Sequence, residues 1–511
     1  MNNDATITKL LAVAWLWAIA AVPAHAGEPA RPNIVFILAD DMRWDAMSCA
    51  GNPLLRTPHL DRLAREGLRF DNAFVTTPIC ATSRASILTG QYARRHGVHD
   101  FRTPLADPAA TYPLLLRQAG YFTGFIGKWG VHAEVKSEFV DWTGRFDFWA
   151  GDMNQTLYWH GRDCAWVVSD GTSDRATAFC TCGAEARHAE GVRGTGPHPA
   201  LREPLHAETE IVPAQVRSFL DQRDPHKPFC LSVSLKAPHG PWSGYAPRFA
   251  GDFAGESVPR RPSVNEADAL RQPAFLRQSL GSALGLSYAK DTTGGGPRDQ
   301  ALRQYYRLIL GVDYCVGEVL SELEARGLSG NTVVVFSSDN GHFAGEHGFA
   351  GKWLLHEESI RVPLLVLDPR IPAARRGTVC DALVLNIDLC PTFLEWAHVA
   401  VPAGVQGKSL VPLLDDAGGG EAAAPFRDGF FLEHLYSHGK AAPSRIEPSE
   451  GYRTRDEKYI IYIEQQGPRR EQLFALRDDP DELHDLAREP ESQPRLERLR
   501  GRHQRSRKDL E

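Results

Sequence analysis

The chain has 511 residues, a net charge of −7 and 42% hydrophobic residues, which is typical of a soluble globular protein. Its length is sufficient for a large core and more than one domain. The modest negative charge, spread over a long chain, argues against a dedicated nucleic-acid-binding protein and identifies no partner.

The N-terminus has the features of an export signal. Lys9 precedes an apolar run (10–22), and Ala24 and Ala26 fit a small-x-small cleavage site. The run is shorter than the ~20 apolar residues of a membrane span. We therefore expect a signal peptide over residues 1–26, a periplasmic or secreted location and no stable membrane insertion. An uncleaved anchor is the alternative.

Five apolar runs predict strands buried on both faces, because they are rich in β-forming residues and nearly continuous. They are NIVFILAD (33–40), YFTGFIGK (121–128), FCLSVSLKAPH (229–239), TVVVFSSDN (332–340) and RVPLLVLDP (361–369). The clearest helix is 302–326, which has an apolar face and stops at Gly327. Alternating strands and helices predict an α/β fold with a mostly parallel central sheet between helices.

The rest of the chain suggests two folded parts. Residues 150–205 show little periodicity and indicate an insertion, and 415–425 has the composition of a linker. The segments FFLEHLY, DEKYIIYIE and QLFALRDD then predict a small antiparallel sheet, and the Arg- and Glu-rich tail (489–511) predicts a solvated helix. We expect a catalytic domain over 27–415 and an α+β subdomain over 426–511.

The nine cysteines are an odd number for an exported chain. If Cys80 is modified, the other eight could pair or stay buried. Cys164, Cys180 and Cys182 cluster in one polar stretch. We expect a disulfide there rather than a zinc site, because nearby histidines such as His188 lack ligand spacing.

Four of the predicted strands end in side chains of catalytic type. These are Asp40-Asp41, Lys128, His239 and Asp339-Asn340. In open parallel sheets, sites gather beyond the carboxyl ends of strands, so we expect these side chains at one edge. Each alone could simply serve a turn or cap. The two acidic pairs offer only oxygen ligands, which suits a hard cation such as Ca²⁺ or Mg²⁺ rather than zinc.

The segment CATSRASILTGQYARRHG, which starts at Cys80, predicts a helix that Ser83 could cap. A helix N-terminus favours negative charge, and Arg84 adds a fixed cation nearby. These residues describe an activated nucleophile or an anion site. The alternative is a buried structural cysteine.

The same segment resembles the signature of type I sulfatases, which belong to the alkaline phosphatase superfamily. The family pattern is Cys-x-Pro-Ser-Arg followed by Leu-Thr-Gly. Cys80, Ser83, Arg84 and the Leu-Thr-Gly at 88–90 are in register, while Thr82 stands where the pattern most often has proline. Further fragments resemble other family motifs in the same order: RPNIVFILADDMRWD, GKW, KAPHGPW, SSDNGHFAGEHGFAGKWLLHEESIRVPLLV and the C-terminal EGYRTRDEKYIIY with QLFALRDDPDELHDLA.

The resemblance implies an alkaline-phosphatase-like large domain and the hydrolysis of sulfate esters. It implies calcium, with magnesium less favoured, at the ligand set Asp40, Asp41, Asp339 and Asn340. It also implies that a formylglycine-generating enzyme oxidises Cys80 to formylglycine, whose hydrated form attacks sulfur. The substrate class is a sulfated carbohydrate or a small sulfate ester.

The resemblance also assigns roles to the remaining site residues. Lys128 and Lys352 would hold sulfate oxygens, and His239 would protonate the leaving alcohol. Arg84 would orient the nucleophile or a metal ligand. After GKW the family usually has a histidine, but here the position is Gly130. Either His132 substitutes from a shifted loop, or the role is lost.

The sequence is also compatible with two other functions. A phosphodiesterase or phosphonate monoester hydrolase could use the same architecture and metal pair. A non-catalytic protein that binds sulfated glycans would keep the groove and leave Cys80 unmodified. The departures at Thr82 and Gly130 motivate this second alternative.

Overall fold

The computed structural model describes most of the chain from residue 31 to residue 510. The described ranges are 31–105, 107–132, 134–135, 138–139, 142–153, 155–164, 166, 182, 201–291, 295–415, 425–437, 445–463 and 469–510. The proposed signal peptide lies outside these residues, so export stays a prediction, as do the expected domain boundaries. Within the described part of the chain, no helix combines the length and apolarity that a bilayer crossing requires.

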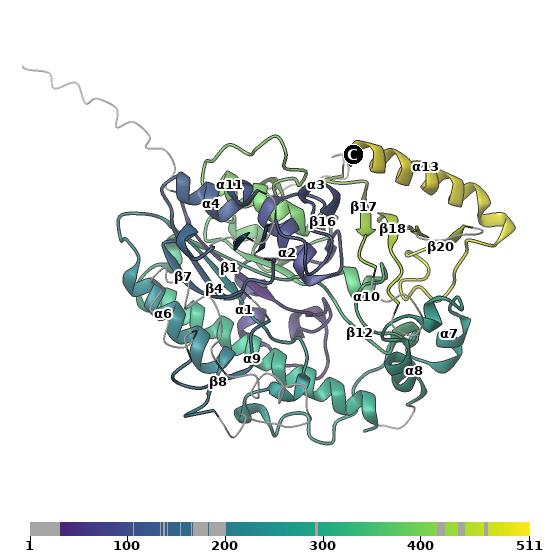
Figure 1. The fold of residues 1–511 in the computed structure, drawn as a ribbon, viewed down its shortest axis with the longest axis horizontal. Coiled ribbons are helices and arrows are strands. Elements are labelled where there is room, and N and C mark those ends of the chain that lie inside the picture. Colours follow the sequence, from purple (N-terminus) through teal and green to yellow (C-terminus); the bar gives the residue numbers. More distant parts are fainter. Residues whose placement is uncertain are drawn as a thin grey trace, which may run out of the picture. The chain divides into compact units, whose positions relative to one another are not determined.

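An eight-stranded sheet forms the centre of the large domain (Figure 1). In spatial order its strands are β15 (Thr378–Cys380), β2 (Leu68–Phe70), β14 (Leu364–Leu367), β11 (Thr332–Ser338), β1 (Asn33–Ala39), β10 (Phe229–Ser234), β4 (Phe122–Lys128) and β7 (Phe148–Asp152). All neighbours are parallel except β14, which runs antiparallel to both β11 and β2. The predicted mostly parallel sheet is confirmed.

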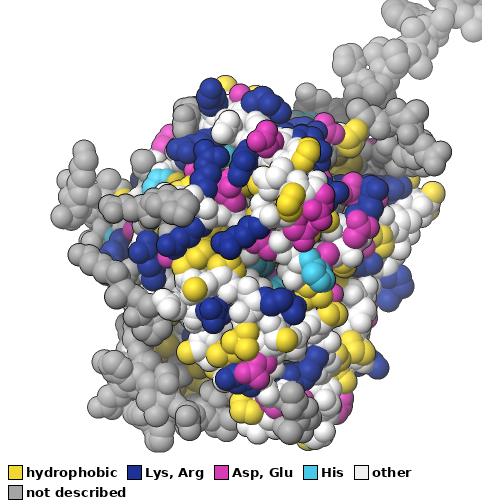
Figure 2. Space-filling view, turned by 90° about the vertical axis from the view of Figure 1, so that its right-hand side faces the viewer, with side chains coloured by type: hydrophobic (Ala, Val, Ile, Leu, Met, Phe, Trp, Pro, Cys, Tyr) yellow, Lys and Arg dark blue, Asp and Glu magenta, His cyan; other side chains and the backbone are white. Residues whose placement is uncertain are grey.

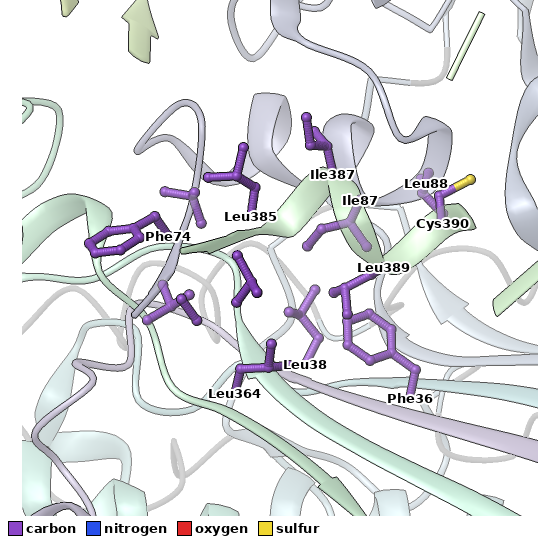
Figure 3. Packing of buried hydrophobic residues seen from close by; sticks show 14 of the residues in the cluster. Phe36, Leu38, Phe74, Ile87, Leu88, Leu364, Leu385, Ile387, Leu389 and Cys390 are labelled. Atoms are coloured by element: carbon purple, nitrogen blue, oxygen red, sulfur yellow. The ribbon is translucent and has the colours of Figure 1, made fainter. Parts of the chain in front are cut away.

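The central strand β1 shows why the strand runs are continuously apolar. Because successive side chains point to opposite faces, Ile34, Phe36 and Leu38 join one hydrophobic core, while Val35 and Ile37 join another. Helices α2, α4 and α11 pack on the first face, and α1, α6 and α9 pack on the second. Figure 3 shows part of the first core, where side chains of α2 meet those of the sheet. Both faces of β1 are therefore buried, and its carboxyl end opens at one edge of the sheet.

The helices have the following bounds: α1 (Pro58–Glu66), α2 (Cys80–Thr89), α3 (Ala93–His96), α4 (Tyr112–Gln118), α6 (Val212–Gln222), α7 (Glu266–Arg271), α8 (Ser282–Lys290), α9 (Pro297–Ala325), α10 (Glu357–Ile360), α11 (Leu389–Trp396), α12 (Val411–Asp415) and α13 (Gln493–Leu510). The helix predicted over 302–326 is α9, with its predicted apolar face buried. It begins five residues earlier, at Pro297, because proline is well suited to the first helical position.

The C-terminal part forms a four-stranded antiparallel sheet, as predicted. Its order is β17 (Gly429–His434), β18 (Ser449–Thr454), β19 (Lys458–Tyr462) and β20 (Arg470–Phe474). Helix α13 buries Leu496 and Leu499 against Tyr452, Tyr459 and Leu473 of this sheet. On the face of the molecule shown in Figure 2, basic side chains lie interspersed with acidic ones.

The smaller strands form four two-stranded ribbons. They are β3 (Ala73–Phe74) with β16 (Val384–Leu385), β5 (Glu134–Val135) with β6 (Glu138–Phe139), β8 (Trp159–His160) with β9 (Leu205–His206), and β12 (Phe343–Ala344) with β13 (Ala350–Gly351). The β12–β13 ribbon directly precedes Lys352 and so positions this lysine.

A buried ion cluster joins α10 of the large domain to the C-terminal sheet. Glu357 accepts two 3.0 Å hydrogen bonds from the guanidinium of Arg453, and its carboxylate lies 3.1 Å from Lys458 Nζ. Burial alone would raise the pKa of Glu357, but Arg453 and Lys458 hold it well below its ordinary value.

We expect Glu357→Gln to lower the free energy of unfolding by about 3–5 kcal/mol, because it leaves the buried Arg453 guanidinium without its carboxylate partner, whereas Lys458 keeps its ion pair with Glu482. A carboxylate with a lowered pKa stabilises the fold above its unfolded pKa, about 4.3, and loses that contribution as pH falls. Urea unfolding measures this effect. The difference in free energy of unfolding between the wild type and Glu357→Gln should be larger at pH 7 than at pH 4. The exposed Glu395 of α11 provides the control: Glu395→Gln should change stability by less than about 0.5 kcal/mol at either pH.

Candidate active site

Strand register brings the two predicted acidic pairs together. In the parallel pair β1 and β11, Ala39 lies opposite Ser338. The next residue on each strand, Asp40 and Asp339, therefore leaves the sheet at the same edge. The backbone N–H of Asp41 donates to Asp339 Oδ1 at 3.1 Å. Asp41 takes a left-handed backbone conformation, with φ of +66°, which turns the chain back toward the second pair.

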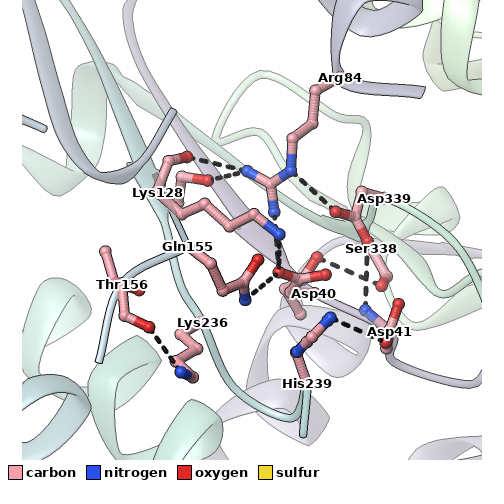
Figure 4. A network of polar contacts seen from close by, with 12 residues as sticks. Asp40, Asp41, Arg84, Lys128, Gln155, Thr156, Lys236, His239, Ser338 and Asp339 are labelled. Carbon is pink, nitrogen blue, oxygen red and sulfur yellow. Dashed lines mark hydrogen bonds and ion pairs between the residues drawn. The ribbon is translucent and has the colours of Figure 1, made fainter. Parts of the chain in front are cut away.

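Three buried cations surround these carboxylates, and Figure 4 shows two of them, Lys128 and Arg84. Lys128, at the end of β4, forms an ion pair with Asp40. Arg84 Nε donates to Asp339 Oδ2 at 2.8 Å, and the same guanidinium lies 3.6 Å from Asp40. Lys352 Nζ lies 2.5 Å from Asp41 Oδ1. All six side chains are less than 10% exposed, so each charge acts through protein rather than water.

The charges shift the acid strengths of the carboxyl groups in different directions. Although burial would raise the pKa of Asp40, Lys128, His239 and Arg84 hold it well below its ordinary value. Burial would likewise raise the pKa of Asp41, and Lys352 is the main group that lowers it. Burial and the neighbouring Asp40 raise the pKa of Asp339 to about 6. The site thus holds closely spaced negative charge that additional positive charge would stabilise.

Two buried oxygens in this cluster support a cation site. Asp40 Oδ1 and Asn340 Oδ1 have no hydrogen-bond partner among the described residues. Asn340 instead donates its Nδ2 to Asp41 Oδ1 at 2.6 Å. A buried polar atom without a partner is costly, and a hard divalent cation would accept both oxygens. The residues present therefore fit the predicted calcium ligands.

Cys80 is the first residue of α2, and it is only 5% exposed. Its thiol lies within electrostatic reach of two of the cations. Burial would lower the pKa of Lys352, but Asp41 and then Cys80 raise it above its ordinary value. Burial would also lower the pKa of Arg84, but Asp339, Asp40 and Cys80 raise it above its ordinary value. The N-terminus of α2 thus presents Cys80 to a cationic surface.

The expected capping role of Ser83 is wrong. The N-cap of α2 is Ile79, and Ser83 lies inside the helix, where its N–H donates to Ile79 O at 2.8 Å. Its hydroxyl accepts a 2.9 Å hydrogen bond from Asn386 Nδ2 instead. The helix starts earlier than predicted because the segment is buried and tertiary packing, rather than a local cap, fixes its first turn.

His239 lies beside Asp41, with its Nε2 3.7 Å from Asp41 Oδ2. Its Nδ1 faces the carbonyl of Gly240 at 2.8 Å, which favours the tautomer with the proton on Nδ1. The side chain is 29% exposed, so Nε2 can meet a substrate. Burial lowers the pKa of His239, while Asp40 and Asp41 oppose that shift.

Position 130 has no room for the histidine that the resemblance leads one to expect. Gly130 has φ of +72°, and a Cβ there would lie 2.8 Å from Arg84 Cδ and 3.1 Å from Lys128 Cε. His132 pairs through its backbone with Pro104. None of the described contacts joins His132 to the carboxylate cluster, and its catalytic role stays a prediction.

We expect Gly130→Ala to reduce both stability and activity, because the new methyl group displaces Arg84. Gly97 is a matched control: its φ is +80°, but a Cβ there meets nothing within 4 Å. Gly97→Ala should cost only the left-handed backbone penalty of about 1–2 kcal/mol. Thermal unfolding and kcat/KM should show a larger loss for Gly130→Ala in both quantities. Equal losses for the two variants would contradict the contact with Arg84.

Sequence reasoning missed several polar residues around the site. Gln155 Nε2 donates to Asp40 Oδ2 at 3.3 Å. The Tyr158 hydroxyl donates to His239 O at 2.5 Å, and Lys236 Nζ donates to Thr156 O at 2.5 Å. Gln155, Thr156 and Tyr158 belong to the segment without periodicity, which gave no signal. Lys236 could have been noticed from its place in KAPHGPW.

Comparison with known proteins assigns the chain to a family. The family model described as Sulfatase matches residues 32–399. The chain belongs to the sulfatase family. A second model, N-sulphoglucosamine sulphohydrolase, C-terminal, matches residues 345–509. The protein is thus a hydrolase of this family within the alkaline phosphatase superfamily, as the sequence predicted.

Curated relatives of this sulfatase cover nearly its full length. It is 29% identical to N-acetylglucosamine-6-O-sulfatase of Bacteroides thetaiotaomicron, over 94% of this chain and 87% of the relative. It is 28% identical to arylsulfatase of Clostridium perfringens, over 92% of this chain and 93% of the relative.

Solved structures share the fold of the sulfatase. One, determined in complex with its substrate D-glucosamine-2-N,6-O-disulfate, has a TM-score of 0.74 and 28% identity, covering 94% of this chain and 98% of the other. Phosphonate monoester hydrolase of Agrobacterium radiobacter has a TM-score of 0.69 and 21% identity, covering 94% and 96%. The second likeness concerns the fold alone.

Proposed function

We propose that this sulfatase releases inorganic sulfate from a sulfated carbohydrate, with O-sulfated amino sugars as the first class to test. The observation that carries the proposal is the arrangement around Cys80. Buried oxygen ligands from β1 and β11 lie among Arg84, Lys128 and Lys352, in a chain of the sulfatase family. Such a site neutralises an anionic ester before a nucleophile attacks it.

The metal site of the proposal consists of four side chains at the sheet edge: Asp40, Asp41, Asp339 and Asn340. All donors are oxygens, which favours calcium, with magnesium as the less favoured choice. Bound there, the cation would act as a Lewis acid that polarises a sulfate oxygen. Arg84 contacts both Asp40 and Asp339 and so helps to fix the positions of these oxygen ligands.

The nucleophile of the proposal is residue 80 after a formylglycine-generating enzyme has oxidised it, since the hydrated aldehyde provides a hydroxyl for attack on sulfur. Lys128 and Lys352 bind the remaining sulfate oxygens and stabilise the charge that develops in the transition state. His239 gives a proton from Nε2 to the leaving alcohol, while its Nδ1 contact with Gly240 keeps the ring oriented.

A substrate panel tests the reaction class. We expect sulfate release from N-acetylglucosamine 6-sulfate, glucosamine 2-N,6-O-disulfate and 4-nitrophenyl sulfate, with kcat/KM above that for bis(4-nitrophenyl) phosphate or a phenylphosphonate monoester. The reverse order would favour the phosphonate hydrolase alternative. A peptide mass spectrum across residue 80, from protein made in its native host, should show formylglycine. Unmodified cysteine together with no sulfate release would favour the non-catalytic glycan-binding alternative.

Export is a separate part of the proposal. Lys9, the apolar run and the Ala24–Ala26 site support cleavage after Ala26. N-terminal sequencing of the protein from the periplasm or medium of its host should begin at Gly27. A mature chain that begins at its first residues would contradict cleavage.

A further inference from the structure

A second cluster of metal-ligand side chains lies outside the proposed active site. His160 is the last residue of β8, and the sulfurs of Cys164 and Cys182 lie close to its ring. His160 Nδ1 lies 3.6 Å from Cys164 Sγ and 3.8 Å from Cys182 Sγ. The three candidate ligand atoms all lie within 4.8 Å of one another. The residues are 0%, 3% and 8% exposed, respectively, so the cluster is closed from solvent as structural metal sites are.

The distances fit a tetrahedral zinc ion. Zinc binds sulfur at about 2.3 Å and nitrogen at about 2.0 Å, so tetrahedral angles place a nitrogen and a sulfur ligand about 3.6 Å apart. The two nitrogen–sulfur distances in the cluster are 3.6 Å and 3.8 Å. The structure does not bond the two described sulfurs to each other.

The orientation of the His160 ring also fits metal binding. Its Nε2 lies 3.0 Å from the carbonyl of Leu157, which fixes the proton on Nε2 and leaves the Nδ1 lone pair facing both sulfurs. A metal-binding histidine commonly uses its second nitrogen in this way. The Trp166 ring packs 4.5 Å from the imidazole, and its Nε1 donates to Ala150 O at 2.8 Å. The Trp166 ring therefore covers one side of the imidazole.

A single cation would account for the convergence of the three atoms. With the Leu157 carbonyl on the Nε2 side of the ring, Nδ1 offers one lone pair, and both sulfurs lie close to it. One cation accepts electron pairs from all three atoms at once. The sequence favoured a disulfide over zinc because His188 lacked suitable spacing, and that reasoning overlooked His160; Cys180 lies outside the described residues.

We propose that His160 Nδ1 and the thiolates of Cys164 and Cys182 occupy three of the four tetrahedral positions of a structural Zn²⁺ ion, separate from the proposed calcium site. Binding releases the two thiol protons to solvent and changes no oxidation state. The ion would link Cys164 and Cys182 to His160 at the end of β8. Tyr158, two residues before His160, donates to the carbonyl of His239, so the bound zinc also steadies one wall of the active site.

Metal analysis of the full-length protein, purified without chelator, tests the proposal. We expect about one zinc per chain in the wild type and less than about a tenth of that in Cys164→Ser and Cys182→Ser. Cys315→Ala provides the control, because Cys315 is fully buried in α9 and is not one of the three candidate ligands, and this variant should keep its zinc. Zinc retained by both serine variants would place the metal elsewhere, for example at Asp40, Asp41 and His239, and would overturn the proposal.

Two measurements on the wild type remain decisive if the serine variants do not fold. Cobalt substituted for zinc should show the absorption of thiolate-to-cobalt charge transfer, which the sulfur-free set of Asp40, Asp41 and His239 cannot give. Mass spectrometry after thiol alkylation should find Cys164 and Cys182 outside any disulfide. Absence of the charge-transfer band, or either cysteine in a disulfide, would overturn the zinc site.

Discussion

Cys80→Ala is expected to lower kcat/KM for a sulfated amino sugar by at least about 10⁴-fold, or roughly 5.5 kcal/mol of transition-state stabilisation. The variant removes the proposed nucleophile, and neither Lys128 nor Lys352 can replace it as a hydroxyl nucleophile. Steady-state sulfate release measures the effect. The content of the proposed calcium ion should not change, because its oxygen ligands directly follow β1 and β11 and do not belong to α2.

A matched cysteine separates loss of chemistry from loss of packing. Cys390 of α11 is fully buried and contacts the C-terminal end of α2, where a Cβ on Gly90 would lie 3.1 Å from Cys390 Cβ. Cys390→Ala should lower stability by about 1 kcal/mol and leave kcat/KM within about threefold of wild type. If Cys80→Ala retained sulfate release near the wild-type level, residue 80 would not be the nucleophile.

His239→Ala is expected to reduce kcat/KM by about 10²–10⁴-fold on a sugar sulfate and by much less on 4-nitrophenyl sulfate. A sugar alkoxide is a poor leaving group and needs a proton, which we propose comes from Nε2, whereas 4-nitrophenolate departs without one. The ratio of the two losses therefore reports leaving-group protonation. A structural role for the histidine would reduce both rates alike.

His342 provides the control for His239→Ala. Its ring lies within electrostatic reach of Asp41, Lys352 and His239, and burial lowers its pKa to about 4, so it is neutral at pH 7. His342→Ala should affect the two substrates equally. If it changed their ratio as strongly as His239→Ala does, the assignment of the proton donor to His239 would be wrong.

The sheet-edge part of the site could be predicted because it depends on a general property of parallel sheets. Adjacent parallel strands of similar length deliver their next residues to the same edge, so Asp40 and Asp339 meet wherever β1 and β11 pair. The same argument placed Lys128 at the end of β4. It required only the strand runs, which are long and apolar enough to recognise.

The contacts that were missed depend on tertiary packing. Nothing in the local sequence shows that a side chain at 130 would meet Arg84 across 46 residues, or that α2 begins at Cys80 rather than after a serine cap. Gln155 and His160 belong to a stretch without periodicity. Their partners, Asp40 and the two cysteines, are identified only once β1, β7 and β8 have been placed.

The burial of α2 has a consequence for the order of events during biosynthesis. All ten residues of the helix are buried, with Cys80 only 5% exposed. A modifying enzyme therefore cannot bind the segment in the folded protein. If residue 80 is to carry an aldehyde, the oxidation has to reach the chain while it is still extended. Incubation with a formylglycine-generating enzyme should then convert the unfolded chain and leave the folded one as cysteine. A host that folds the chain faster than it oxidises it would accumulate a stable, correctly shaped and permanently inactive protein.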